Sequence, residues 1–290
     1  MGTLTTDVAG FLLVDKPAGI TSHDVVSIVR RSVHTRRVGH AGTLDPFATG
    51  LLVVMVGRGT RLLPFIDGEP KVYDATIAFG TETDTDDATG STTREAPPPT
   101  EQAINEGIAR LTGEIDQIPP AYSAKKVGGT RAYAAARRGE QVDLAPARVV
   151  IHRWEILARD DASLSARITC GGGTYIRALA RDLGRLAGSA AHLATLRRIR
   201  SGVFDVGDAA TVDDVRAGVV ELRSLRDAIP SLATRELTDV ELARVLHGNP
   251  VIDEHASLDR FALVDDHGEL VAIAERSGSE LRPKVVLRDA

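Results

Sequence analysis

The sequence has few of the residues and segments that mark several classes of protein. Its 290 residues include one cysteine, and only 4% are aromatic. A single cysteine can form neither an internal disulfide nor a zinc site built from thiolates alone, so we expect a reducing compartment, the cytoplasm. No stretch approaches about 18 uninterrupted apolar residues, so no membrane span is predicted. The first residues also lack the basic region of a signal peptide.

What is present is the composition of a globular protein. Hydrophobic residues make up 43% of the chain and charged residues 26%, which is enough apolar surface for a core. The length suggests a large domain and a small one. Residues 238–246 predict a short helix, and FALVDD, LVAIAE and KVVLR predict strands. We therefore expect a boundary near residue 230, with a large domain at 1–230 and a small β-rich domain at 231–290.

The net charge of -5 conceals an uneven distribution. Residues 1–120 carry 10 basic and 16 acidic residues, and residues 203–290 carry 10 and 18. Residues 121–202 carry 15 basic and 6 acidic residues, and 13 of those 15 are arginine. The planar guanidinium group suits phosphate, so this segment is a candidate for binding nucleic acid. An ordinary solvated basic surface explains the same count, and the charge alone does not separate the two.

Strands and helices alternate irregularly along the large domain. Strands are expected at 11–14, 51–57, 72–79, 149–157 and 163–169. Helices are expected after Ser22 as N-cap, at 100–112, and within GGGTYIRALARDLGRLAG. Residues 36–50 and 81–99 are predicted loops, and the second should be mobile. This pattern predicts an α+β fold with a mixed, mostly antiparallel sheet flanked by helices.

Many familiar catalytic motifs are missing. There is no phosphate-binding GxxxxGK[ST] loop, no GxSxG and no HExxH. The acidic segment from Asp84 does not fit a calcium loop, because Ala88 and Thr89 stand where a ligand and a glycine are needed. The eight histidines are scattered, so no metal site is predicted.

Two segments remain as candidates for chemistry. RRVGHAGTLDPFATG (36–50) places Asp45 among cations and glycines, which suits a carboxylate held ionised as a nucleophile or base. Asp45 could equally be only a turn residue before proline. In GTYIRALARDLG (173–184), Tyr175 and Arg177 share a face of an extended segment, and together could stack a base and pair with a carboxylate. The alternative is a core tyrosine and a surface arginine.

At this point the sequence resembles a known family, the TruB-type tRNA pseudouridine synthases. Seven segments occur in the family's order, over about residues 11–230. They are LLVDKPAGITSHD (12–24), RRVGHAGTLDPFATGLLVV (36–54), KVYDATIAFG (71–80), TDTDDATG (83–90), IPPAYSAKKVGG (118–129), GGTYIRALARDLG (172–184) and AHLATLRRIRSG (191–202). Together these segments are far more specific than any one motif.

The resemblance implies a role for each matching residue. Asp45 is the expected catalytic aspartate, and Arg177 its partner. Tyr73 is expected to stack on the uracil that is flipped out of the RNA, with Tyr175 and Leu196 lining the pocket. The remaining two expected substrate-binding residues are His40, near the displaced nucleotides, and Lys16, which is either structural or in contact with RNA.

The resemblance also implies the reaction and its substrate. The enzymes of this family convert the T-loop uridine of tRNA, at position fifty-five, to pseudouridine, without a cofactor or a metal. We therefore expect the T-arm stem-loop of tRNA as partner, no membrane or protein partner, and a monomer. Residues 231–290 are expected to form a PUA-like domain, which would be a divergent one because the region is acidic.

Two other readings of the residues stay open. A non-catalytic module that binds or folds tRNA would keep its function when Asp45 is changed to Asn. A glycosidase-like hydrolase using Asp45 needs a second carboxylate in the site, and the motifs offer none nearby.

Overall fold

The computed structural model describes residues 8–66, 68–122, 126–127, 130–131, 144–254 and 258–288. The chain divides into two compact units, each formed by segments that are separate in the sequence. The first consists of Met1–Asp45, Leu52–Asp67 and Asp208–Ala290, and the second of Pro46–Leu51 and Gly68–Gly207. Strand β3 (Thr49–Val56) contributes residues to both units. The expected domain boundary near residue 230 stays a prediction.

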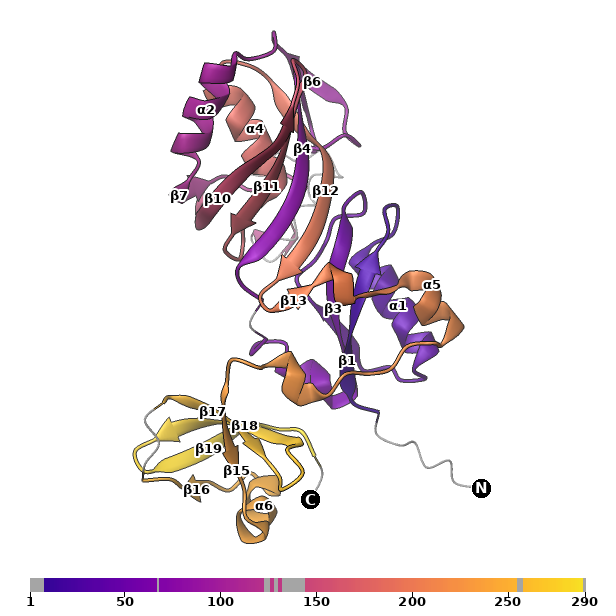
Figure 1. Ribbon diagram of the computed structural model, residues 1–290, viewed down its shortest axis with the longest axis vertical. Helices are drawn as coiled ribbons and strands as arrows, with labels where there is room; N and C mark the ends of the chain where they lie inside the picture. Colours follow the sequence, from indigo (N-terminus) through magenta and orange to yellow (C-terminus); the bar gives the residue numbers. More distant parts are fainter. Residues whose placement is uncertain are drawn as a thin grey trace. The chain divides into compact units, whose positions relative to one another are not determined.

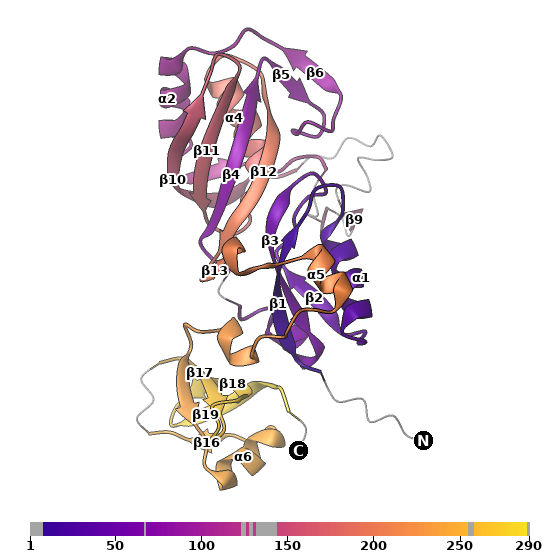
Figure 2. The same cartoon turned by 45° about the vertical axis from the view of Figure 1, so that its right-hand side comes forward.

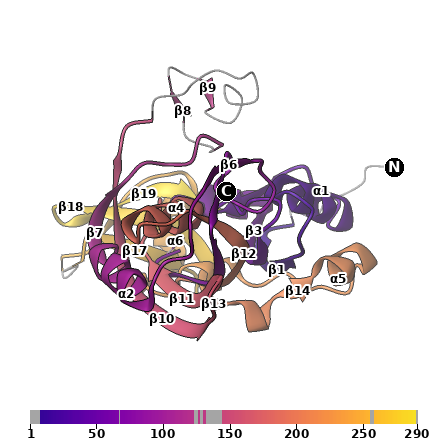
Figure 3. The same cartoon turned by 90° about the horizontal axis from the view of Figure 1, so that it is seen from above.

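The second unit is an antiparallel sheet with two helices on one face (Figure 1). Its strands, in spatial order, are β12 (Ala191–Ser201), β4 (Lys71–Phe79), β11 (Ser163–Cys170), β10 (Ala147–Arg159) and β7 (Gly113–Gln117). Figure 3 looks down on this unit and shows α2 (Glu101–Arg110) and α4 (Ile176–Leu186) on the same side of the strands. Helix α4 packs against both α2 and β12.

The two faces of strand β4 differ as its alternating sequence predicts. Tyr73, Ala75, Ile77 and Phe79 are buried on one face. On the other face Asp74 accepts two hydrogen bonds, at 2.8 and 2.9 Å, from the guanidinium group of Arg167 on β11. The polar face therefore binds strand to strand, while the apolar face forms the core of the unit.

The first unit contains strands that pair with one another. Strands β1 (Gly10–Lys16) and β3 are neighbours, β14 (Ala210–Thr211) pairs with β1, and β2 (Val38–Ala41) pairs with β3. Helices α1 (Ser22–Ser32) and α5 (Val212–Ala217) lie side by side (Figures 1 and 2). Valine and leucine side chains of β1, β3, α1 and α5 form the core.

The remaining described elements are short. They are η1 (Gly57–Leu62), β5 (Thr81–Thr83), β6 (Thr92–Glu95), β8 (Lys126–Val127), β9 (Thr130–Arg131), β13 (Phe204–Asp205), η2 (Val206–Asp208) and η3 (Leu225–Ala228).

The C-terminal part of the first unit is a five-stranded sheet with one helix (Figure 2). Its elements are β15 (Ala233–Glu236), α6 (Asp239–Leu246), β16 (Val251–Ile252), β17 (Arg260–Val264), β18 (Leu270–Ser277) and β19 (Glu280–Val286). Leu237, Val245 and Leu263 are among the apolar residues of its own buried cluster. The helix and the strands expected from residue 238 onward are confirmed.

Four local expectations were wrong. Arg177 does not share an extended segment with Tyr175, because helix α4 begins at Ile176 and Tyr175 is its N-cap. The N-cap of α1 is Thr21, which forms a capping box with Asp24, and Ser22 is the first helical residue. The predicted loop at 36–50 includes strand β2, and the predicted loop at 81–99 includes the paired strands β5 and β6. Both segments are rich in polar residues or glycine, which conceals strands that are only three or four residues long. The mobility expected at 81–99 stays a prediction.

Among the residues that the structure describes, no helix is both long and apolar enough to cross a membrane.

Candidate active site

The loop that carries Asp45 is fastened to the start of helix α1. The buried hydroxyl of Ser22 donates to the carbonyl oxygen of Leu44 at 3.0 Å and accepts from the amide of Leu44 at 2.9 Å. Both residues are almost fully buried, at 2% and 3% exposed, whereas Asp45 is half-buried. A side chain that satisfies both backbone groups of one residue fixes that residue's peptide planes, so the position of Asp45 is set by its neighbour.

The loop then runs into strand β3, where a glycine permits a close approach. Thr49 and Gly50 pair in parallel with Arg197 and Arg198 of β12. Gly50 has φ of +100°, and a Cβ atom there would lie 2.3 Å from the carbonyl oxygen of Arg198. Only glycine fits, because any other residue would be strained and would collide with the backbone of β12.

Two of the site candidates, Tyr73 and Leu196, lie with Arg198 on one face of the sheet in the second unit. Leu196 lies opposite Ala75 in the β12–β4 register, and Arg198 lies opposite Tyr73. Directly opposed residues share a face, so Tyr73, Leu196 and Arg198 project to the same side. All three are buried in the structure, at 7%, 8% and 1% exposed. The Nε–H of Arg198 donates to the carbonyl oxygen of Leu51 at 2.7 Å.

The topology brings Tyr175 and Arg177 to the same end of this sheet. Lys71, at the start of β4, pairs with Cys170, the last residue of β11. From Cys170 the chain passes through a short turn to Tyr175, the N-cap of α4. Tyr73 is two residues from Lys71, so the base-stacking candidate and the helix start lie near one sheet end. Cys170 itself is buried, and burial raises the pKa of its thiol to about 11, which suits a packing residue.

Gln117 holds the backbone at the start of α4. The side-chain oxygen of Gln117 accepts from the amide of Tyr175 at 2.8 Å, and its NH2 group donates to the carbonyl oxygen of Tyr175 at 3.1 Å. The side chain of Tyr175 does not cap the helix. The side-chain amide of Gln117, at the end of strand β7, binds the backbone there instead. The helix start that carries Arg177 is thereby tied to the neighbouring strand.

Arg177 is a buried cation with several fixed acceptors. It is 4% exposed, and its guanidinium group donates to the carbonyl oxygens of Thr85 and Tyr122, each at 2.8 Å. A carboxylate oxygen of Asp87 lies 3.6 Å from the same group. The local sequence left open whether Arg177 is a surface salt-bridge residue, and its burial excludes that interpretation.

Asp87 is oriented by threonine neighbours. One of its carboxylate oxygens accepts from the hydroxyls of Thr85 and Thr89, at 2.8 and 2.5 Å, and from the amide of Thr89 at 2.9 Å. The other oxygen is the one that faces Arg177. Dividing the two oxygens in this way fixes the carboxylate plane, and with it the side of Arg177 that Asp87 occupies.

His40 and Lys16 lie in the first unit. His40 is half-buried on β2, opposite Val54. Lys16 is fully buried at the end of β1, and its ammonium group donates to the carbonyl oxygens of Pro17 and Ile20 at 3.0 and 2.8 Å. The ammonium group of Lys16 does not point to the surface, where RNA would bind, because the turn that follows β1 encloses it. Of the two roles considered for Lys16, the structure favours the structural one.

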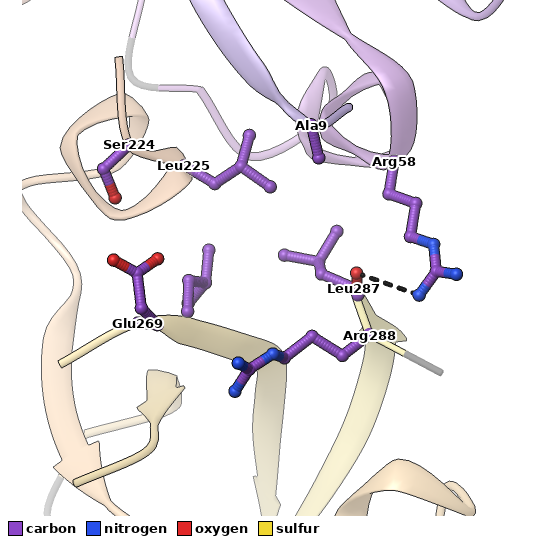
Figure 4. Close-up of a pocket in the computed structure, with 8 residues that line it drawn as sticks. Ala9, Arg58, Ser224, Leu225, Glu269, Leu287 and Arg288 are labelled. Atoms are coloured by element: carbon purple, nitrogen blue, oxygen red, sulfur yellow. Dashed lines mark hydrogen bonds between the residues drawn. The ribbon is translucent and has the colours of Figure 1, made fainter. Parts of the chain in front are cut away.

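None of these candidates lines the pocket that Figure 4 shows in the first unit. This pocket has a volume of about 400 Å³ and is lined by Ala9, Arg58, Ser224, Leu225, Glu269, Leu270, Leu287 and Arg288. Arg58 donates to the carbonyl oxygen of Leu287 there at 3.4 Å. Within the described part of the chain, no three histidine, cysteine or acidic side chains form a cluster that could hold a metal ion.

Two family descriptions match the chain in succession. Residues 30–176 match the N-terminal domain of the TruB family of pseudouridylate synthases, and this match spans about half of the chain. Residues 177–247 match the C-terminal domain of tRNA pseudouridylate synthase B. The chain belongs to the TruB family of pseudouridylate synthases. It is accordingly an isomerase, as the resemblance of its motifs implied.

Relatives within the TruB family extend over nearly the whole chain. The tRNA pseudouridine synthase B of Thermobifida fusca is 44% identical over 287 residues, which cover 96% of this chain and 98% of the relative. The protein of the same name from Paracoccus denitrificans is 42% identical, covering 97% and 96%. The likeness therefore includes the C-terminal sheet as well as the site motifs.

Solved structures confirm the α+β fold expected for a TruB-family chain. A Cbf5–Nop10–Gar1 complex contains a chain with a TM-score of 0.72 and 24% identity, covering 97% of this chain and 85% of that one. An H/ACA ribonucleoprotein bound to a substrate RNA containing 2′-deoxyuridine gives a TM-score of 0.72 at 23% identity, covering 96% and 85%. At these identities the likeness concerns the fold alone.

Four residues around the candidate site escaped sequence reasoning. They are Ser22, Gln117, Asp87 and Arg198, all buried and all bound to the candidate residues or to their immediate neighbours. Each lies within a TruB-type segment or, for Gln117, directly before one. Position within those segments was a usable signal, whereas residue type alone was not.

Proposed function

We propose that this TruB-family enzyme converts uridine to pseudouridine in tRNA, at the T-loop position fifty-five. The curated relatives are named tRNA pseudouridine synthase B. The seven sequence segments that resemble this family include every candidate site residue of this chain. The single observation that carries the proposal is that Arg177, within its family motif, is buried and bound to fixed acceptors, with a carboxylate oxygen of Asp87 3.6 Å away.

Asp45 would be the catalytic carboxylate. Pseudouridine formation breaks the bond between N1 of uracil and C1′ of ribose, rotates the base and joins C5 to C1′. An ionised aspartate can serve by attacking C6, by attacking C1′ or by removing a proton from C2′. Arg177 is the proposed partner of this carboxylate, since a planar guanidinium group binds a carboxylate through charge-assisted hydrogen bonds.

Tyr73, Leu196 and Tyr175 would hold the flipped base. Unstacking a uridine from a folded loop costs a few kcal/mol, and stacking on an aromatic ring returns about 1 to 3 kcal/mol. Tyr73 and Leu196 share the buried face of the sheet, and Tyr175 begins the helix at the same sheet end. His40 is proposed to lie beside the displaced T-loop nucleotides, and Lys16 to act by holding the turn after β1.

RNA phosphates would bind exposed arginines of the basic segment 121–202. The segment's charge is not all available, because Arg177, Arg181 and Arg198 are buried and hold carbonyl or carboxylate groups. Arg153 and Arg200 remain well exposed, at 71% and 55% of the side chain. We expect affinity for tRNA to fall as salt rises, with a slope set by the exposed cations alone.

The other expectations follow from this function. The enzyme would act as a monomer in the cytoplasm, without a cofactor. Its C-terminal sheet would serve as a divergent PUA-like domain that helps to hold the tRNA.

The test is to incubate the protein with an unmodified T-arm stem-loop and to map pseudouridine in the product. We expect one pseudouridine, at position fifty-five, and none when that uridine is replaced by cytidine. Pseudouridine at another position would overturn the assignment of the site. RNA binding without any pseudouridine would favour a non-catalytic tRNA-binding or tRNA-folding module.

A further inference from the structure

Two arginines of helix α4 connect the same pair of segments. Arg177 donates to Thr85 and Tyr122, and one helical turn later Arg181 donates to the carboxylate of Asp86 at 2.8 Å and to the carbonyl oxygen of Ile118 at 2.9 Å. Each guanidinium group thus bridges the segment after β5 to the segment after β7. Residues four apart on a helix lie on one face, so the two bridges are stacked one above the other.

A left-handed residue lets two successive carboxylates face the helix. Successive side chains of an extended segment point to opposite sides, so adjacent acids cannot both meet α4. Asp86 has φ of +59°, and the resulting kink allows Asp86 to meet Arg181 while Asp87 meets Arg177. Strand β12 fixes the kink, since the amide of Leu193 donates to the carbonyl oxygen of Asp86 at 3.0 Å.

We propose that Asp86 and Arg181 are positioning residues for Arg177, because they hold the kinked segment and the 118–122 segment at the spacing that Arg177 spans. The inference rests on the proposed function of Arg177 as partner of the catalytic carboxylate. Neither Asp86 nor Arg181 is assigned a contact with the substrate.

The burial of the pair supports positioning over simple stabilisation. Asp86 and Arg181 are 7% and 8% exposed, and the pairing of two charges at such depth adds little stability over an apolar pair, because desolvation offsets much of the attraction. Burial raises the pKa of Asp86, and the charge of Arg181 opposes that rise. What the pair does provide is direction, since a planar guanidinium group binds two acceptors at fixed angles.

Two substitutions alter the charge or the geometry of the Asp86–Arg181 pair while keeping side chains of similar size. Asp86→Asn removes the charge while keeping a residue that tolerates a left-handed backbone. Arg181→Lys keeps the charge but replaces the planar fork by a single ammonium group. The matched control is Arg185→Lys, one turn further along α4, where Arg185 is half-exposed and pairs with Glu82, which Arg94 also binds.

Two measurements are made on the full chain. The first is the single-turnover rate of pseudouridine formation in the T-arm stem-loop, with RNA affinity and thermal unfolding measured in parallel. The second is the set of guanidinium NMR signals of Arg177 in the free, arginine-labelled protein, identified by their loss in Arg177→Lys. The NMR measurement requires no activity, so it tests the positioning even if the proposed reaction is wrong.

We expect Asp86→Asn and Arg181→Lys to shift the Arg177 signals and to lower the rate by about tenfold to a hundredfold, because small displacements of a catalytic group are costly. RNA affinity should stay within about twofold, as expected when only transition-state interactions are lost. Arg185→Lys should change neither quantity. If both variants keep the wild-type Arg177 signals and the wild-type rate per folded molecule, the proposal is overturned and the pair has only a structural role.

Two further outcomes also test the proposal. If wild-type protein forms no pseudouridine but the Arg177 signals shift in both variants, the positioning stands and the proposed reaction fails. If the signals shift while an active enzyme keeps its rate, the precise placement of Arg177 has no role and the proposal is overturned.

Discussion

The hydroxyl of Ser22 exchanges two hydrogen bonds with the backbone of Leu44, at 3.0 and 2.9 Å. Ser22 is the first residue of α1, whose capping is left to Thr21 and Asp24. The serine is thereby released from the capping role that its position suggests. It serves instead to fix the residue directly before Asp45, so the helix start and the proposed catalytic loop form one local structure.

Ser22→Ala should slow catalysis more than it weakens RNA binding. The change leaves the buried amide and carbonyl of Leu44 without this partner, which costs about 1 to 3 kcal/mol, and it frees the loop that orients Asp45. We expect a single-turnover rate at least tenfold lower, on the order of what misplaced catalytic groups lose. The control is Ser27→Ala, which removes only an exposed hydrogen bond to His23 within α1. Equal rates in the two variants would contradict this role of Ser22.

Asp87→Asn should weaken the hold on Arg177 without unfolding the protein. The replacement keeps the shape of the side chain and an oxygen for its threonine partners, but it removes the charge that lies 3.6 Å from Arg177. We expect a lower kcat with little change in affinity for the T-arm stem-loop. Asp84→Asn on the same segment, where Asp84 is exposed and accepts from the amide of Ser91, should keep the wild-type kcat. A change in affinity alone would count against the positioning of Arg177 by Asp87.

The sheet could be predicted from the sequence, whereas the burial of the acidic residues near Arg177 could not. The alternation along 72–79 identified the buried face of β4, because every second side chain enters the core. The segment at 81–99 was taken for a loop because it is polar, although Glu82, Asp86 and Asp87 are buried. Their arginine partners on α4 lie about 90 residues or more away in sequence, and no local pattern reveals such a pairing.

The candidate site, too, could be predicted only in part from the sequence. Motif resemblance supplied Asp45, Arg177 and Tyr73, but not Gln117, whose two bonds to Tyr175 connect β7 to the start of α4. A glutamine at the end of a short strand has no distinctive neighbours in sequence. Its role depends on a helix that begins 58 residues later, so only the folded structure reveals it.

Gly50→Ala should destabilise the protein much more than Gly188→Ala. Both glycines have positive φ, at +100° and +70°, but a Cβ atom at 188 meets nothing within 4 Å. Its cost should be that of a left-handed alanine, about 1 to 2 kcal/mol. At position 50 the Cβ atom would lie 2.3 Å from the carbonyl oxygen of Arg198, so β3 and β12 must separate. Thermal unfolding of the two variants measures the difference, and equal losses would contradict the close approach.

The C-terminal sheet should lose a stabilising ion pair in acid. The hydrogen bond from Arg235 is the main cause that lowers the pKa of Glu241 from 4.5 to about 2. Because the folded-state pKa is depressed, the stabilisation is present above about pH 4.5 and is lost as pH falls toward 2. Glu241→Gln should therefore speed hydrogen exchange in α6 at neutral pH, and the difference from wild type should shrink across that window. Glu236→Gln, at an exposed position on β15, is the control. A difference that does not depend on pH would contradict the assignment.

The most direct test of the account compares Asp45→Asn with Asp74→Asn on an unmodified T-arm stem-loop. Asp74 lies on the face of the sheet opposite to Tyr73, and its carboxylate is bound to Arg167. The loss of this carboxylate should therefore affect stability and leave the chemistry intact. We predict that Asp45→Asn binds the RNA with wild-type affinity and forms no pseudouridine, while Asp74→Asn forms it at the wild-type rate per folded molecule. Pseudouridine formation by Asp45→Asn at the wild-type rate would contradict the central claim.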